Sequence, residues 1–229
     1  MKARNNIRFQ VLEARYINSA VECLNEARNQ PGSSNKGLGV TELNYSSEDS
    51  IFSYFPRSQL TTIVAIDTSK TDYVCGIYPS LDLPDYEKYL KLKTQDLLLG
   101  EKNKISLKIM EPLFALNQQN GKILMVLNIG VRQEYENQKI AQNLQSLFLD
   151  NAQRLGYLIA GGIASNPTTI HIFMKNGFQV LHSIDLSECD LPDKMKKTQH
   201  KNVFLFGKFL FKKNLALNQN HQFTQQPSL

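Results

Sequence analysis

The chain has 229 residues, 41% of them hydrophobic, and its 26 lysines and arginines against 21 acidic residues give a formal net charge of +5. This length suits one sizeable core, and the charge suits an anionic ligand, but without basic-aromatic repeats it gives no reason to expect nucleic acid as a partner. The cysteines Cys23, Cys75 and Cys189 are odd in number and widely spaced, so we expect neither a disulfide framework nor a metal site. No apolar run is long enough for a signal sequence or a membrane span, so a cytoplasmic protein with no membrane partner is expected.

The first half of the chain predicts a strand, a helix, a long loop and a hairpin. Residues 7–14 alternate apolar and polar side chains, as a half-buried strand does, and residues 14–28 switch to helical spacing. Residues 29–49 are rich in Gly, Ser, Asn and Pro over a length that indicates a functional loop or disorder. A short capped helix is expected within residues 46–55. Residues 61–78 hold two β-rich runs around a polar turn, which predicts a hairpin.

Helices and one buried strand are expected in the middle of the chain. The spacing of apolar residues from 85 to 120 is helical, with breaks expected around Gly100 and Pro112. Residues 122–131 form a continuous apolar run, which is typical of a strand that is buried on both faces. A helix over residues 137–155 is expected to follow it.

The last third of the chain predicts a well-delimited helix among three strands. Asn166 is expected to be the N-cap of this helix, with Pro167 at the first helical position. Gly177 is expected to be the left-handed residue that ends it. The strands are expected at residues 157–165, 180–187 and 201–209.

The order of these elements predicts an α/β fold of the α+β type, with a central mixed sheet of about six or seven strands and helices on both faces. We expect residues 1–211 to form a single domain. Residues 212–229 are polar and have no core to join, so they are expected to form a disordered tail.

Two blocks in the second half carry a recognisable spacing. The first has a valine at the end of the buried strand and then a loop that leads into a helix, at Val131, Glu136, Lys139, Ala141 and Leu144. The second has an asparagine, an aromatic residue seven positions later and a Gly-Phe pair at eleven and twelve, at Asn166, Phe173, Gly177 and Phe178. Both blocks resemble the GNAT acetyltransferase superfamily, and within it most the arylalkylamine (dopamine-type) N-acetyltransferases. The likeness covers residues 6 to 211.

The resemblance implies acetyl-CoA as co-substrate, bound where the sheet opens after residue 131. It implies a diphosphate cradle of main-chain N–H groups between Glu136 and Ala141, and a pantetheine arm that runs along the end of the buried strand. The cofactor-binding residues that it implies are Ile129, Gly130, Val131, Glu136, Asn137, Gln138, Lys139, Ile140, Ala141, Asn166 and Phe173.

Two residues in the predicted cradle depart from the family pattern. Glu136 places a negative charge where the family has a positive or neutral donor, which costs on the order of 1 kcal/mol beside a phosphate. Lys139 replaces a glycine, so it loses the close backbone approach but adds a cation that offsets Glu136. An ordinary solvent-facing helix start, with no ligand, is the alternative interpretation of this stretch.

A reaction of the GNAT type needs a base for the amine, a donor for the thioester oxygen and a proton for the thiolate. The resemblance implies that a main-chain N–H near Gly130 or Val131 is the donor. Glu42, in a TELN turn that resembles the family's acidic turn, is the candidate base, with an exposed loop glutamate as the alternative. Phe173 stands where the family has a tyrosine acid, so water or another tyrosine is expected to protonate the thiolate.

Three functions follow from the sequence as hypotheses. The first is transfer of an acetyl group from acetyl-CoA to the primary amine of a small arylalkylamine-like or polyamine-like molecule, by a monomer or homodimer. The second is a catalytically impaired GNAT-like protein that binds acyl-CoA or another ligand. The third is a basic interaction module without a cofactor.

Overall fold

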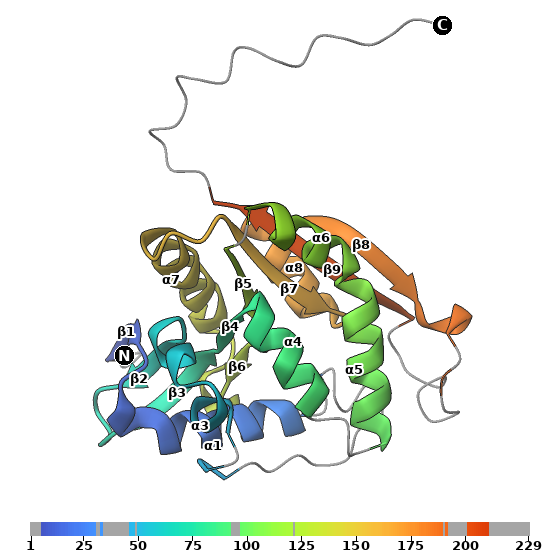
Figure 1. The fold of residues 1–229 in the computed structure, drawn as a ribbon. Coiled ribbons are helices and arrows are strands. Elements are labelled where there is room, and N and C mark those ends of the chain that lie inside the picture. The colour runs from blue at the N-terminus through green and yellow to red at the C-terminus, as the bar shows by residue number, and fades with distance from the viewer. Residues whose placement is uncertain are drawn as a thin grey trace, which may run out of the picture.

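The computed structural model of the chain describes residues 6–30, 33, 46–48, 50–92, 97–120, 122–189, 191 and 201–210. Within these ranges the strands form two sheets, one of four strands in the order β1-β2-β3-β6 and one of five in the order β4-β5-β7-β9-β8 (Figure 1). The strands are β1 Ile7–Val11, β2 Ile63–Asp67, β3 Tyr73–Tyr78, β4 Ser80–Asp82, β5 Ile123–Val126, β6 Gly130–Val131, β7 Ile159–Ala164, β8 Gln179–Asp185 and β9 Asn202–Phe209. The mixed α/β fold is confirmed, but its strands are divided between two sheets.

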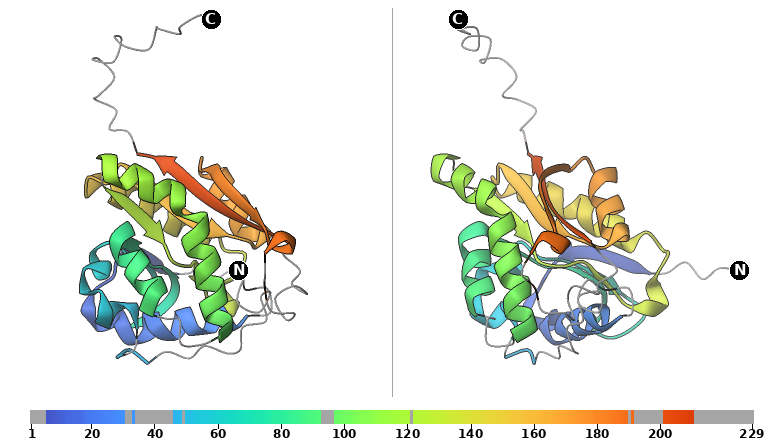
Figure 2. Two further views of the ribbon diagram at one scale, coloured as in Figure 1. Left: turned by 45° about the vertical axis from the view of Figure 1, so that its right-hand side comes forward. Right: turned by 90° about the vertical axis from the view of Figure 1, so that its right-hand side faces the viewer.

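The helices surround these sheets. They are α1 Ile17–Asn29, α3 Ile51–Tyr54, α4 Leu83–Leu92, α5 Leu97–Ile109, α6 Glu111–Asn120, α7 Ile140–Arg154 and α8 Pro167–Lys175. The right-hand view of Figure 2 shows α5 and α6, in green, on one side of β9 and α8, in orange, on the other. Both faces of the second sheet are therefore covered by helices.

The first sheet is covered on both faces because successive strand residues point to opposite sides. Ile63 and Ala65 of β2 pack in the same core cluster as the α7 residues Leu144 and Phe148. Their neighbours Val64 and Ile66 pack instead with Val21 and Leu24 of α1. A strand with two buried faces reads as an uninterrupted apolar run, which is how β2 appears in the sequence.

The predicted strand at 122–131 is interrupted by a bulge. Val126 pairs with Ser80, whereas Gly130 pairs with Ile77, so three residues on one strand, 127–129, face only two on the other. The bulge turns the chain from the second sheet into the first and divides the predicted strand into β5 and β6. It accounts for one of the strands beyond the expected six or seven, and the short β4 accounts for another.

Strands β5 and β7 separate at this bulge. They pair in parallel from Ile123 and Ile159 to Val126 and Gly162, and β6 then pairs with β3 instead. The divergence of the two strands is as predicted, but it begins after Val126 and not after residue 131. No described strand pairs with the side of β6 that faces away from β3, and we call this side the open edge of β6.

Two predicted helix boundaries were wrong. Gly100 does not break the helical region but lies inside α5. The break expected around Pro112 is confirmed, since it falls at Met110 and Pro112 takes the second position of α6. Helix α7 begins at Ile140 rather than at residue 137, because Asn137 and Lys139 both have positive φ angles. Glu42 and the predicted tail lie outside the described residues.

Candidate functional site

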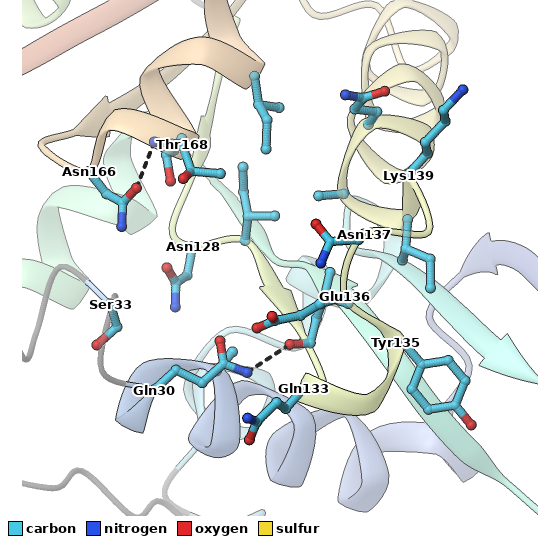
Figure 3. Close-up of a pocket in the computed structure, with 18 of the residues that line it drawn as sticks. Gln30, Ser33, Asn128, Gln133, Tyr135, Glu136, Asn137, Lys139, Asn166 and Thr168 are labelled. Carbon is cyan, nitrogen blue, oxygen red and sulfur yellow. Dashed lines mark hydrogen bonds between the residues drawn. The ribbon is translucent and has the colours of Figure 1, made fainter.

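A cleft of about 770 Å³ lies between the open edge of β6 and the first turns of α7 and α8 (Figure 3). Helix α1 contributes its C-terminal end to the floor. Eight of the eleven residues that the resemblance implied for cofactor binding line this cleft: Ile129, Val131, Glu136, Asn137, Lys139, Ile140, Ala141 and Asn166. Motifs far apart in the sequence therefore meet in one concave site.

The register of β6 determines which main-chain groups face the cleft. The Arg132 N–H donates to the Cys75 carbonyl oxygen of the β3 strand at 2.9 Å. Because N–H groups alternate sides along an extended strand, the N–H and C=O of Val131 point away from β3, towards the cleft. Gln30 Nε2 donates to that Val131 carbonyl oxygen at 3.1 Å. Of the two candidate donors, Gly130 and Val131, the register favours Val131.

Helix α7 presents uncapped N–H groups to the cleft. Its N-cap residue, Lys139, is in the left-handed region with φ of 61°, and the Lys139 side chain makes no capping hydrogen bond. The first-turn residues Ile140, Ala141 and Gln142 all line the cleft. The N–H groups of a first turn have no partner within the helix, and the helix dipole is positive there. This end of the cleft suits a phosphate or another anion.

Helix α8 begins at the opposite wall of the same cleft. Asn166 Oδ1 accepts a hydrogen bond from the Thr168 N–H at 2.8 Å, and Pro167 takes the first helical position. The predicted cap is therefore confirmed, as is the left-handed Gly177 that ends the helix, with φ of 76°. Two helix N-termini converge on one cleft, which strengthens its positive potential. Contact between Asn166 and a cofactor stays a prediction.

The two charged residues of the cradle point in different directions (Figure 3). The Lys139 side chain runs along α7 and away from the middle of the cleft, whereas the Glu136 carboxylate extends towards the side where Gln30 and Asn128 lie. Neither charge has a hydrogen-bond or ion-pair partner among the residues that the structure describes. A ligand at the start of α7 therefore meets the main chain first.

Arg132 anchors the segment that connects β6 to α7, the 132–139 loop. Its guanidinium donates to the Val74 carbonyl oxygen at 2.8 Å, to Glu26 at 3.1 Å and to Glu22 at 3.3 Å. Glu26 also accepts from the Gln133 N–H at 3.1 Å. The loop is thus tied to both α1 and β3 at its first two residues.

The β2–β3 hairpin holds the middle of the same loop. Tyr135, which is 6% exposed, donates its hydroxyl to Asp67 at 2.5 Å, and Tyr73 donates its hydroxyl to Glu134 at 2.6 Å. Hydrogen bonds from Ser69 and then from Tyr135 lower the pKa of Asp67, and the Tyr73 hydroxyl lowers the pKa of Glu134. Burial and then the Glu134 bond raise the pKa of Tyr73 to about 12.

Three residues of the implied set do not line the cleft. Gly130 lies in the β3–β6 ladder, and Gln138 Nε2 donates to the Glu134 carbonyl oxygen at 3.4 Å. Phe173 is 1% exposed and stacks with Phe206 at a centroid distance of 5.2 Å. It fills the space above Gly162, where an added Cβ would come within 2.6 Å of its ring. The placement of Phe173 supports a packing role, and its contact with a cofactor stays a prediction.

Sequence reasoning assigned no role to several lining residues. They are Ala27, Gln30, Ser33, Asn128, Gln133, Tyr135, Gln142, Thr168, Thr169, His171 and Ile172. Ala27 and Gln30, from α1 and its C-terminal end, could not be identified from the sequence because they belong to neither motif block. Thr168 and Thr169 could have been found, since they directly follow the N-cap in the first turn of a helix with a recognised start.

The described part of the chain lacks the features of two other kinds of site. No group of three His, Cys, Asp or Glu side chains there is placed to hold a metal ion. No helix in those ranges combines the length and the apolar surface needed to cross a bilayer.

The fold and the cleft can be compared with known proteins. No protein-family model and no curated sequence matches the chain. Arylalkylamine N-acetyltransferase 2 from Aedes aegypti has a similar structure, with a TM-score of 0.71, 16% identity, and coverage of 90% of this chain and 100% of that one. A mosquito arylalkylamine N-acetyltransferase like 5b gives 0.68 at 18% identity, covering 89% and 100%. The polyamine N-acetyltransferase of Drosophila melanogaster, which forms N-acetylagmatine, gives 0.67 at 12% identity, covering 89% and 100%.

These likenesses confirm the predicted fold: the chain has the GNAT fold of the N-acetyltransferases. At such identities they speak for the fold alone. What the cleft does must be argued from its own residues.

Proposed function

We propose that this protein is an acetyl-CoA-dependent N-acetyltransferase that acts on the primary amine of a small molecule. One observation carries the proposal: the open edge of β6 and the first turn of α7, which the 132–139 loop connects, line the same cleft. That arrangement suits a ligand with an extended, amide-containing arm and an anionic head. The volume of about 770 Å³ lies in the range of ligand-binding clefts.

The residues fit acetyl-CoA in their order along the cleft. The first-turn N–H groups of Ile140, Ala141 and Gln142 would hold the diphosphate, and the open edge at Val131 would pair with the arm. When bound, acetyl-CoA supplies a thioester whose carbonyl carbon reacts with an amine. The Val131 N–H is fixed in the strand and is oriented towards the cleft, so it can stabilise negative charge on an oxygen there.

The groups that would transfer protons are less well defined than the groups that would bind acetyl-CoA. An alkyl amine is mostly protonated at neutral pH and needs a base or a water chain. We retain Glu42 as the candidate base. Tyr135 is a poor acid, because burial and its bond to Asp67 raise the pKa of its hydroxyl. Water therefore remains the proposed proton donor to the thiolate.

Acetyl-CoA would itself occupy this cleft, so the charges of its lining do not define the acceptor. The resemblance of the two motif blocks to the arylalkylamine group supports the choice of acceptor class. We propose arylalkylamine-like amines as the preferred acceptors and polyamine-like amines as the second class.

Isothermal titration with acetyl-CoA tests the cradle directly. Ala141→Asp places a carboxylate in the first turn of α7, and we expect it to weaken binding about tenfold or more at low salt. Ser146→Asp adds the same charge at an exposed position further along α7 and serves as the matched control. Failure of the wild-type protein to bind acetyl-CoA at low ionic strength would exclude the proposal and leave a basic interaction module.

A thiol-release assay then separates turnover from binding. The panel compares tyramine and tryptamine with agmatine and spermidine, and we expect the first pair to have the higher kcat/KM. One observation favours a second function, a catalytically impaired acyl-CoA-binding protein: the position of the family's tyrosine acid holds Phe173, which is buried in the core. Binding of acetyl-CoA without thiol release over the whole panel would establish that alternative.

A further inference from the structure

The 132–139 loop has no glycine, although its backbone adopts a conformation that glycine favours. Asn137 and Lys139 have φ angles of 63° and 61°, in the left-handed region. Asparagine tolerates this region, but lysine rarely occupies it. Such backbone persists only where the surrounding structure imposes it. Some other part of the molecule must therefore hold the loop.

The β2–β3 hairpin is placed to do so. Asp67 ends β2 and Tyr73 begins β3, on either side of the turn, and they bond to Tyr135 and Glu134 with donor–acceptor distances of 2.5 and 2.6 Å. We call these four residues the hairpin clamp. Asp67 is itself oriented by Ser69, whose N–H and hydroxyl donate to the other carboxylate oxygen at 2.9 and 2.6 Å.

Aromatic and cationic contacts reinforce the hairpin clamp. The rings of Tyr73 and Tyr135 lie 6.2 Å apart. Lys70 Nζ lies 4.0 Å from the centroid of the Tyr73 ring and 4.0 Å from a Glu134 carboxylate oxygen. The Arg132 guanidinium carbon lies 4.4 Å from the same Tyr73 ring. Two cations thus contact the Tyr73 ring, and its hydroxyl donates to Glu134 in the loop.

Both bonds of the hairpin clamp join a neutral hydroxyl to an ionised carboxylate. Such charge-assisted bonds are shorter and stronger than those between neutral groups. The raised pKa of each tyrosine and the lowered pKa of each carboxyl keep these states at neutral pH. The loop is consequently held before any ligand arrives.

We propose that the hairpin clamp is a positioning device: it holds the 132–139 loop in its left-handed conformation and so keeps the first-turn N–H groups of α7 open to an anionic ligand. Asp67, Tyr73, Glu134 and Tyr135 are its positioning residues. The claim that the hairpin clamp favours acetyl-CoA binding rests on the proposed function above. The claim that it holds the loop conformation is independent of that function.

Hydrogen exchange in the ligand-free protein tests the loop. The N–H groups of Tyr135, Glu136 and Asn143 donate to the Arg132, Gln133 and Lys139 carbonyl oxygens at 2.9, 3.2 and 3.1 Å, so their exchange reports loop opening. In the double variant Tyr73→Phe/Tyr135→Phe we expect these three amides to exchange about tenfold faster, with β7 unchanged. The control Tyr16→Phe removes the hydroxyl that accepts from Arg8 at 3.0 Å and should leave them unchanged.

Acetyl-CoA titration with a rescue variant tests the link to binding. We expect the double variant to bind about tenfold more weakly than wild type. Lys139→Gly in the double variant should restore most of the affinity, since glycine adopts the left-handed region without help, whereas Lys139→Ala, which removes the same charge, should not. General destabilisation would show no such difference between glycine and alanine.

Each result decides a separate claim. Unchanged exchange of the three amides in the double variant overturns the hairpin clamp, whatever the ligand. Equal effects of glycine and alanine at position 139 overturn its link to the left-handed backbone. A wild-type protein that does not bind acetyl-CoA overturns the proposed function, and the exchange result still decides the clamp.

Discussion

Helices α7 and α8 start at opposite walls of the same cleft, yet their starts are held in different ways. Helix α8 has an asparagine cap that bonds to the N–H two residues on, followed directly by a proline. Helix α7 starts after a left-handed lysine with no side-chain cap, and its preceding loop is bonded to residues of the β2–β3 hairpin and of α1.

The start of α8 is stabilised by its own residues, whereas the start of α7 depends on contacts with other parts of the chain. The start of α8 carries its own capping group, so its amide at Thr168 is already occupied and its conformation needs no outside contact. The start of α7 keeps its amides unoccupied at the cost of a strained backbone. An open anion site is the expected use of such a start, and the closed start of α8 serves as the wall that faces it.

The largest effect should come from removing the anchor of the α7 loop. Arg132→Met removes the side-chain donor of the Val74 carbonyl and the cation that pairs with Glu22 and Glu26. We expect a loss of about 2–4 kcal/mol of unfolding free energy, measured in urea. Arg15→Met, which removes an exposed pair with Glu13, should cost about 0.5 kcal/mol or less. Similar losses in the two variants would mean that the loop does not depend on its anchor.

Charge changes at the α7 start should affect acetyl-CoA binding next most strongly. Glu136→Arg should tighten binding by about three- to tenfold at low salt, since it removes a carboxylate from the cleft. Lys139→Glu should weaken binding by less, about two- to threefold, because the lysine side chain points away from the middle of the cleft. Both effects should shrink as salt is raised, and a larger effect at Lys139 would contradict this geometry.

Alanine at the two N-cap positions compares the two starts directly. Asn166→Ala should lower the unfolding free energy by about 1 kcal/mol, because it removes the bond to the Thr168 N–H. Lys139→Ala removes no capping bond, so we expect a change of about 0.3 kcal/mol or less in thermal or urea unfolding. A drop in acetyl-CoA affinity beyond the loss of stability in Asn166→Ala would add a cofactor contact to its capping role.

The smallest response should be that of the hairpin clamp to pH near neutrality. The pKa values of Asp67 and Glu134 lie below their ordinary values of 3.8 and 4.5, so their contribution to stability is present above those values and is lost as the pH falls through the lowered ones. Exchange of the Tyr135 and Glu136 amides, corrected for its intrinsic pH dependence, should be constant at neutral pH and rise only in acid. A rise in their exchange rate near pH 7 would mean that a group other than Asp67 or Glu134 controls opening of the loop.

The elements with local signals could be predicted from the sequence. The hairpin, the buried strand and α8 with its Asn166 cap and Gly177 end all depend on residues that are close in the chain. Eight of the eleven implied cofactor residues reach the cleft for the same reason, since the loop and the helix starts follow from their motifs.

The remainder depends on partners that are distant in the chain. Gln30 bonds to the Val131 carbonyl from 101 residues away, and Tyr135 bonds to Asp67 across 68. No periodicity indicates such pairs. The bulge at 127–129 is likewise defined only by counting residues on the partner strand. Gly100 was a false break because one glycine in a helix costs only about 1 kcal/mol, which packing can offset.

The bulge makes the shape of the cleft depend on the number of residues in the chain as well as on their identity. Because the proposed oxyanion donor and phosphate cradle are main-chain groups, most side-chain replacements leave them in place. A change of length does not. Deleting one of the three residues 127–129 would leave two residues opposite residues 78–79. The strand could then pair without interruption, and the two sheets would merge across the cleft. A site of this kind depends on the spacing of its residues, which a comparison of residue identities does not measure.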